Sequence, residues 1–108
     1  MSQTNRILFE LVAERERQET KFPNQHLPSG TTFRYWQAKE NEAKEAVDRQ
    51  VANGTLTWLS VLNEEVCEAF AEMDEDKLRA ELIQVAAVAV RWIEDIDQHA
   101  VDLGASDE

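Results

Sequence analysis

Oxygen-bearing side chains recur in this sequence at a spacing that suits a metal site. Glu64, Glu65 and Glu68 lie in one stretch, and Glu81 and Gln84 lie in a second one. Residues three apart on a helix share a face, so the last two acids of the first stretch project together, as do both residues of the second. Carboxylate and amide oxygens are ligands for Mg²⁺ and Mn²⁺. The spacing therefore predicts a divalent-cation site, provided that two helices bring the stretches together.

The connection between the two stretches is short, which favours an antiparallel helix pair. If the chain turns near Glu75, residues whose numbers add up to roughly 150 lie side by side. Glu68 then faces about position 81 or 82, and Glu65 faces about position 84 or 85. Clustered carboxylates repel each other, so a bundle tolerates them where a cation or basic side chains neutralise the charge. Mg²⁺ often completes its ligand shell with phosphate oxygens, which points to a phosphorylated ligand.

Acids at this spacing are also common on solvated helix faces, and that interpretation stays open. Glu94 and Asp97 repeat the spacing further along the chain. The same antiparallel register places Glu94 opposite about Leu56, which is twelve residues (68 − 56) from Glu68, or about 18 Å along a helix. We therefore expect Glu94 and Asp97 to form a solvated face.

The elements that must position these residues are all predicted to be helices. The prolines and glycines cluster in a loop at 22–30, at Gly54 and at Gly104, and the sequence between them favours helix over 4–21, 32–53, 55 or 57 to 73, and 74–100. Residues 82–90 are apolar nearly all round, which predicts burial on several sides and contact with a partner subunit. We predict a single all-α domain over 1–103, a four-helix bundle completed by oligomerisation, and a frayed acidic tail over 104–108.

Composition narrows the possible partners. The chain has 108 residues, with 22 acidic against 11 basic side chains and a formal net charge of −11. This charge disfavours binding to nucleic acids. The single cysteine, Cys67, excludes an intramolecular disulfide and a multi-cysteine zinc site. No stretch has the pattern of a signal peptide or of a membrane span, so we predict no membrane association and a cytoplasmic location.

The motif residues resemble a known family. Glu-Glu-x-x-Glu at 64–68, followed by Glu81-x-x-Gln84, is similar to the Glu-Glu-x-x-Glu and Glu-x-x-Asp motifs of the MazG-like all-α nucleoside triphosphate pyrophosphohydrolases, with Gln84 where aspartate is expected. The stretch 58–96 carries the specific part of the likeness. The segment 16–30 resembles one found in small phage and actinobacterial members.

The resemblance implies a four-helix MazG-like bundle that hydrolyses a nucleoside triphosphate to the monophosphate and pyrophosphate, in house-cleaning or control of nucleotide pools. It implies that Glu65, Glu68 and Glu81 ligate Mg²⁺, for which Mn²⁺ can substitute, with Gln84 in the remaining ligand position. It implies that Glu64 orients or deprotonates the attacking water. It also implies a homodimer or homotetramer with sites near the subunit interfaces.

Substrate contacts are expected from four further side chains. Lys39 and Arg79 offer positive charge to phosphates, and each is alternatively a plain surface charge. Trp36 is a candidate for stacking on a base, against the alternative of core packing. His26 either reads the edge of a base or caps a helix.

Three hypotheses about function remain open at this point. The chain is a Mg²⁺-dependent nucleotide pyrophosphohydrolase, a catalytically weak or inactive nucleotide-binding protein of the same fold, or a structural helical interaction protein. Gln84 bears on the choice because an amide can offer a ligand oxygen but lacks the charge of aspartate.

Overall fold

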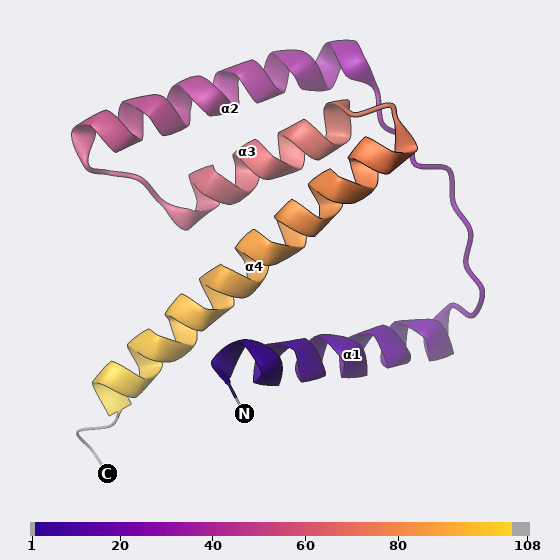
Figure 1. Cartoon of the computed structure of the whole chain (residues 1–108), viewed down its shortest axis with the longest axis vertical. Coiled ribbons are helices and arrows are strands. Elements are labelled where there is room, and N and C mark those ends of the chain that lie inside the picture. Colours follow the sequence, from indigo (N-terminus) through magenta and orange to yellow (C-terminus); the bar gives the residue numbers. More distant parts are fainter. Residues whose placement is uncertain (1, 105–108) are drawn as a thin grey trace. The chain divides into compact units, whose positions relative to one another are not determined.

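The computed structural model describes residues 2–104, and this part of the chain is all-helical, with four helices and no strands (Figure 1). The helices are α1 (Gln3–Lys21), α2 (Phe33–Asn53), α3 (Trp58–Ala71) and α4 (Glu75–Gly104). The prediction of an all-α chain with four helices is therefore confirmed. The predicted tail residues 105–108 lie outside the described part.

Local hydrogen bonds explain where the helices begin and end. The Thr57 side chain accepts a hydrogen bond from the backbone N–H of Ser60 at 3.2 Å and caps the start of α3, as expected for threonine in this position. Gly54 ends α2 in a left-handed conformation (φ 70°), which a residue without Cβ adopts at little cost. Asp74 accepts from the N–H of Lys77 at 2.9 Å and so caps the start of α4.

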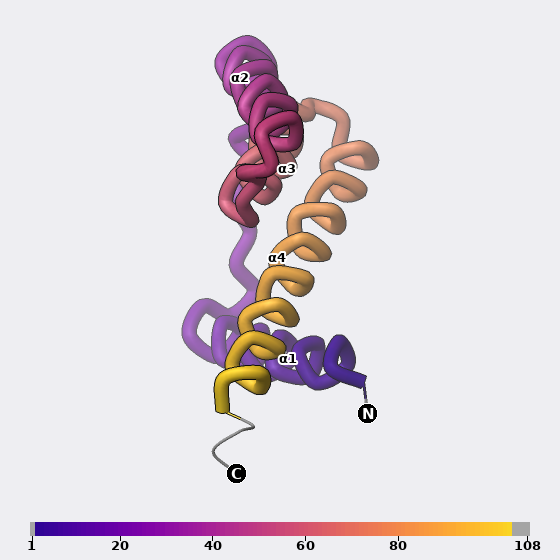
Figure 2. The backbone as a smooth tube through the Cα atoms, turned by 90° about the vertical axis from the view of Figure 1, so that its left-hand side faces the viewer, coloured from indigo at the N-terminus to yellow at the C-terminus, as the bar shows by residue number. Residues whose placement is uncertain are grey.

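Helices α2 and α3 pack side by side, as both Figure 1 and Figure 2 show. Small side chains are buried here, including Ala43 on α2 and Cys67 and Ala69 on α3, so the two backbones can approach closely. The N–H of Thr32 donates to the carbonyl oxygen of Phe70 at 3.1 Å. This bond satisfies a backbone carbonyl near the end of α3 and holds the start of α2 beside it.

The described chain forms two compact units. One consists of residues 30–89, with α2, α3 and the first half of α4; the other combines the N-terminal segment up to Ser29 with residues from Val90 onward. All three acids of the expected cation site belong to the first unit. The prediction of one domain over 1–103 concerns how the two units combine, and it stays a prediction.

Two helix ends differ from the prediction. α3 ends at Ala71 rather than near Met73, because Glu72 adopts an extended conformation (φ −87°, ψ 121°). α4 continues to Gly104 rather than ending near Ala100. Residues 101–103 are compatible with helix, and patterns of sequence locate helix ends only to within a few residues.

The apolar segment of α4 is less buried than predicted. Leu82 is 48 % exposed and Ile83 is 56 % exposed, and Ala86 and Ala87 are exposed as well. Within the single chain this segment is therefore covered on fewer sides than expected, and its burial against a partner subunit stays a prediction. The reason is that α2 and α3 pack chiefly on each other and leave much of this helix uncovered.

Among the described residues, no helix has the combination of length and apolar character that crossing a bilayer requires.

Candidate metal centre

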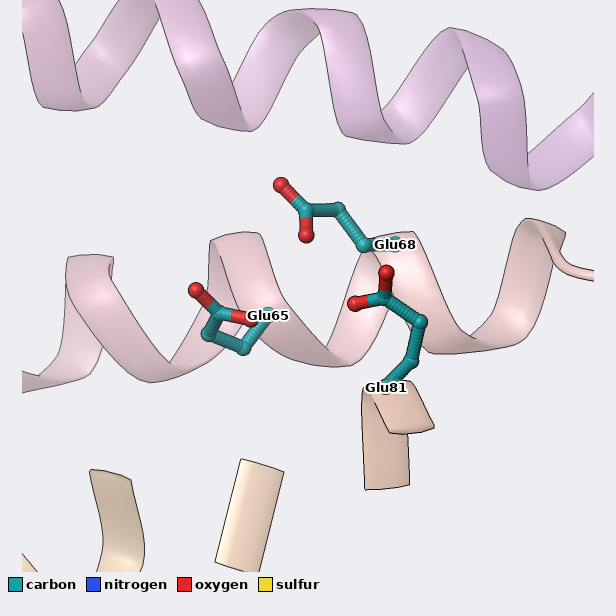
Figure 3. Close-up of side chains that lie close together, drawn as sticks. All are labelled: Glu65, Glu68 and Glu81. Atoms are coloured by element: carbon teal, nitrogen blue, oxygen red, sulfur yellow. The ribbon is translucent and has the colours of Figure 1, made fainter. Parts of the chain in front are cut away.

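Three carboxylates from two helices converge at one place. Glu65 and Glu68 come from α3 and Glu81 comes from α4, and one carboxylate oxygen from each lies within 4.8 Å of the others (Figure 3). The i, i+3 spacing places the α3 pair on one face, and the turn at residues 72–74 reverses the chain so that Glu81 on α4 reaches this pair. The predicted proximity of Glu68 and Glu81 is confirmed, but α3 and α4 diverge beyond their connection (Figure 1) and do not form the predicted side-by-side antiparallel pair.

The three carboxylates of this cluster carry like charges and repel one another. Partial burial, the charges of Glu65 and Glu81 and a hydrogen bond with Glu81 together raise the pKa of Glu68 to about 7, while Lys44 acts in the opposite direction. Partial burial, with the charges of Glu81 and Glu64, also raises the pKa of Glu65. The site therefore favours any species that supplies positive charge, whether a proton or a cation.

The donor set suits a hard divalent cation. All three side chains offer carboxylate oxygens and are partly buried. Ligand oxygens on opposite sides of Mg²⁺ lie about 4.2 Å apart, and around Ca²⁺ about 5 Å apart. The 4.8 Å span lies between these two values, so the three oxygens would have to draw closer together to bind Mg²⁺ or Mn²⁺.

A cavity of about 180 Å³ adjoins the cluster and is lined in part by Glu68 and Glu81. Its wall also includes Glu40 of α2, whose side chain is only 13 % exposed. The Glu40 carboxylate accepts a hydrogen bond from Nε2 of Gln37 at 2.7 Å and pairs with Nζ of Lys44 at 3.5 Å. A fourth acid thus borders the site, held in place by neighbours on its own helix.

Sequence reasoning missed Glu40, although the sequence holds a signal for it. On α2, Trp36, Ala43 and Val47 form a stripe that is partly or fully buried, and Glu40 occupies the position between them at spacings of four and three. An acid on an otherwise apolar helix stripe is expected to be a partly buried charge, which makes it a candidate site residue.

The structure places Glu64 next to the cluster, whereas no hydrogen bond joins Gln84 to the three acids. Glu64 is half-buried and directly precedes Glu65, and its negative charge helps to raise the pKa of Glu65. Gln84 lies one helical turn beyond Glu81 on α4 and is exposed. Neither residue lines the adjoining cavity.

The four residues expected to contact substrate lie in different surroundings. The ring of Trp36 packs edge-on against Phe70, with 4.8 Å between ring centroids, so this tryptophan takes part in the packing of α2 on α3. Lys39 pairs with Glu42 at 3.6 Å. Arg79 is exposed on the second turn of α4. None of the three lines the cavity.

The remaining one, His26, is exposed in the segment between α1 and α2. It belongs to the unit that contains α1, whereas the three carboxylates belong to the unit of residues 30–89. Its predicted role in reading a base or capping a helix stays a prediction.

The second acidic pair differs from the expectation in one member. The Glu94 side chain is only 14 % exposed, accepts a hydrogen bond from the Thr4 hydroxyl and lies 3.9 Å from the guanidinium of Arg91. The expectation of a solvated face is wrong for Glu94, because the start of α1 covers it, whereas Asp97 is exposed.

No protein-family model matches this chain, and no curated protein or solved structure matches it either.

Proposed function

We propose that this chain is a Mg²⁺-dependent nucleoside triphosphate pyrophosphohydrolase of the MazG-like all-α type. It would cleave between the α and β phosphates and release a monophosphate and pyrophosphate, in house-cleaning or control of nucleotide pools. The observation that carries the proposal is the convergence of Glu65, Glu68 and Glu81 within 4.8 Å across two helices.

Holding three acids together costs free energy. Three partly buried acids in one place destabilise the fold unless positive charge compensates for them, and the raised pKa of Glu68 is the sign of that cost. Mg²⁺ bound there would retain open positions for phosphate oxygens and neutralise charge that develops on them. Glu64, next to these ligands, is our candidate for orienting or deprotonating the attacking water.

A second candidate function is nucleotide binding with little or no turnover, and the observation that favours it is Gln84. The amide stands where the motif expects a fourth carboxylate, and the side chain is exposed on α4. One negative charge fewer lowers the affinity for a cation or the number of cations bound. A sequestering protein would need the nucleotide but not a complete catalytic centre.

We further propose that the chain works as a homodimer or homotetramer. Large apolar side chains are exposed on α1 and on the first half of α4, among them Phe9 at 62 %, Val12 at 54 % and Ile83 at 56 %. Exposed apolar surface of this kind is typical of protein interfaces. A partner copy covering α4 would also account for the continuous apolar stretch over residues 82–90.

The test is an activity assay on the full chain. A panel of nucleoside triphosphates is incubated with Mg²⁺ or Mn²⁺, inorganic pyrophosphatase is added, and phosphate is measured. We expect release of pyrophosphate that depends on the metal and is lost in Glu68→Gln and Glu81→Gln. The matched control is Glu45→Gln, which removes an exposed acid of α2 and should leave turnover unchanged.

Each result has a definite meaning. No turnover combined with metal-dependent binding of nucleotides would favour the sequestering protein. Turnover that survives both glutamine substitutions would refute the proposed centre. Without either binding or turnover, the helical interaction protein becomes the better account.

A further inference from the structure

The cavity beside the three carboxylates has the size of one ring system. Its volume is about 180 Å³, whereas pockets that enclose a whole drug-sized ligand measure roughly 300–1,000 Å³. Glu68 and Glu81 form part of its wall, so a nucleotide whose phosphates meet a cation there could place its base in the cavity. We propose that this cavity binds the base and selects cytosine or adenine, which carry an amino group at C4 of the pyrimidine or C6 of the purine, over bases that carry a keto group there. The inference rests on the proposed function in assuming a nucleotide ligand.

Two exposed apolar side chains give the cavity a surface for an aromatic ring. Phe33, the first residue of α2, is 56 % exposed, and Met73, in the connection between α3 and α4, is 62 % exposed. Aromatic rings and thioethers both make favourable contacts with the faces and edges of flat rings. The Thr31 hydroxyl lies 3.8 Å from the sulfur of Met73, so the two segments that carry these side chains are also in contact.

The polar part of the wall presents acceptors. Nε2 of Gln37 donates to Oε2 of Glu40 at 2.7 Å and to Oδ1 of Asn41 at 3.1 Å. Both amide hydrogens are thereby engaged, and the amide oxygen is what Gln37 can offer to a ligand. Glu40 and Glu72 add carboxylates, and no lysine or arginine belongs to the wall.

A wall of acceptors discriminates between bases at the position that carries an amino or a keto group. The amino group of cytosine or adenine donates hydrogen bonds to such a wall. The keto oxygen of uracil at the corresponding position would face carboxylate and amide oxygens without a hydrogen between them, and unpaired polar groups in a pocket cost binding energy. CTP and UTP differ at this C4 group and at the adjacent N3, which carries a hydrogen only in uracil, so they are the most informative pair of ligands for a contact at C4.

The experiment is calorimetric titration of the full chain with the α,β-methylene analogues of CTP and UTP in Mg²⁺. These analogues cannot be cleaved at the proposed bond, so affinity is measured separately from turnover. We expect the CTP analogue to bind about tenfold more tightly, in the range that one or two hydrogen bonds provide. Gln37→Met should reduce this preference to about twofold or less, since it removes the amide oxygen at similar side-chain length.

A second pair of variants tests the ring contact. Phe33→Ala should weaken binding of both analogues by about tenfold, because it removes an aromatic contact. Tyr35→Ala is the matched control, since Tyr35 lies on the same helix, is 59 % exposed and does not line the cavity. Circular dichroism verifies that each variant keeps its helices.

The outcomes separate this inference from the proposed function. Equal affinity for the two analogues, tighter binding of the UTP analogue, or no binding of either one overturns the base selection. If CTP and UTP are nevertheless hydrolysed equally well, the pyrophosphohydrolase proposal stands without it. Preference for the CTP analogue without any release of pyrophosphate supports the base pocket and refutes the enzyme.

Discussion

Two pairs of acids with the same spacing have opposite surroundings in this molecule. On α3, Glu65 and Glu68 face a third acid, Glu81, and the pKa of Glu68 rises to about 7. On the second half of α4, Glu94 accepts a hydrogen bond from the Thr4 hydroxyl and lies near a guanidinium. Both Glu68 and Glu94 are partly buried, so burial does not separate them.

Glu68 and Glu94 differ in the charges and the hydrogen-bond donors on the helix that faces each of them. Glu94 already has partners within the protein, so a cation there would compete with existing hydrogen bonds. In the cluster around Glu68, carboxylate oxygens face other carboxylate oxygens. A cation that binds there reduces the repulsion between these carboxylates. Two acids three residues apart therefore do not define a metal site by themselves. The side chains on the facing helix determine whether the pair is free to bind a cation.

The largest expected effect is on metal affinity. Glu68→Gln should weaken Mg²⁺ binding by about a hundredfold, because it removes one charged ligand of three. Glu94→Gln, the same change in the other pair, should alter the affinity by less than about twofold. Calorimetric titration with MgCl₂ measures both, and equal losses in the two variants would break the comparison.

The next effect concerns the stability of the metal-free protein as a function of pH. The folded state keeps the Glu68 proton up to a pKa of about 7, whereas the ordinary value is 4.5. The folded state therefore binds more protons between these values, and the contribution of this group to stability falls as the pH rises from 4.5 to about 7.

This loss should appear in thermal unfolding. Relative to Glu68→Gln, the parent chain should lose about 5 °C in Tm across that pH range, a value that allows for solvent screening of a partly exposed group. Saturating Mg²⁺ should abolish the loss at pH 7. A constant difference in Tm between the two proteins across the range would contradict the account.

A smaller effect is expected from restoring the missing acid. Gln84→Asp adds a charge one turn beyond Glu81, so Mg²⁺ binding should tighten by about fivefold. The matched control is Gln98→Asp, which adds the same charge to an exposed position in the other half of α4. No change in the Mg²⁺ titration of Gln84→Asp would mean that position 84 does not reach the ion.

The smallest effect belongs to the pair on the other unit. Thr4→Val removes the hydroxyl that donates to Glu94 while preserving the shape of the side chain. Because Thr4 is exposed, we expect the free energy of unfolding to fall by only about 0.5–1 kcal/mol, with Mg²⁺ affinity unchanged. Chemical denaturation measures the change, and a loss of metal binding in this variant would be inconsistent with a centre confined to residues 30–89.

Local sequence patterns were sufficient to predict the helices and part of the candidate metal site. The cap at Thr57 and the stop at Gly54 set the helix ends, and the short turn fixed the pairing of Glu68 with Glu81. These features depend on residues that are close together in the sequence, so the local sequence is sufficient to predict them.

Features that depend on distant segments could not be predicted in the same way. The burial of Glu40 requires α3 to pack on α2, and the cover over Glu94 comes from residues about ninety positions earlier. The exposure of Ile83 likewise reflects which helices do not cover α4, although its sequence alone resembles that of a core helix.

The most direct test of the central claim is to locate a bound ion. Crystals of the full chain grown with Mn²⁺ should show one anomalous scattering peak between Glu65, Glu68 and Glu81, with oxygens at about 2.1–2.2 Å. A peak at Glu94 instead, or three carboxylates that remain without an ion at millimolar Mn²⁺, would contradict the account.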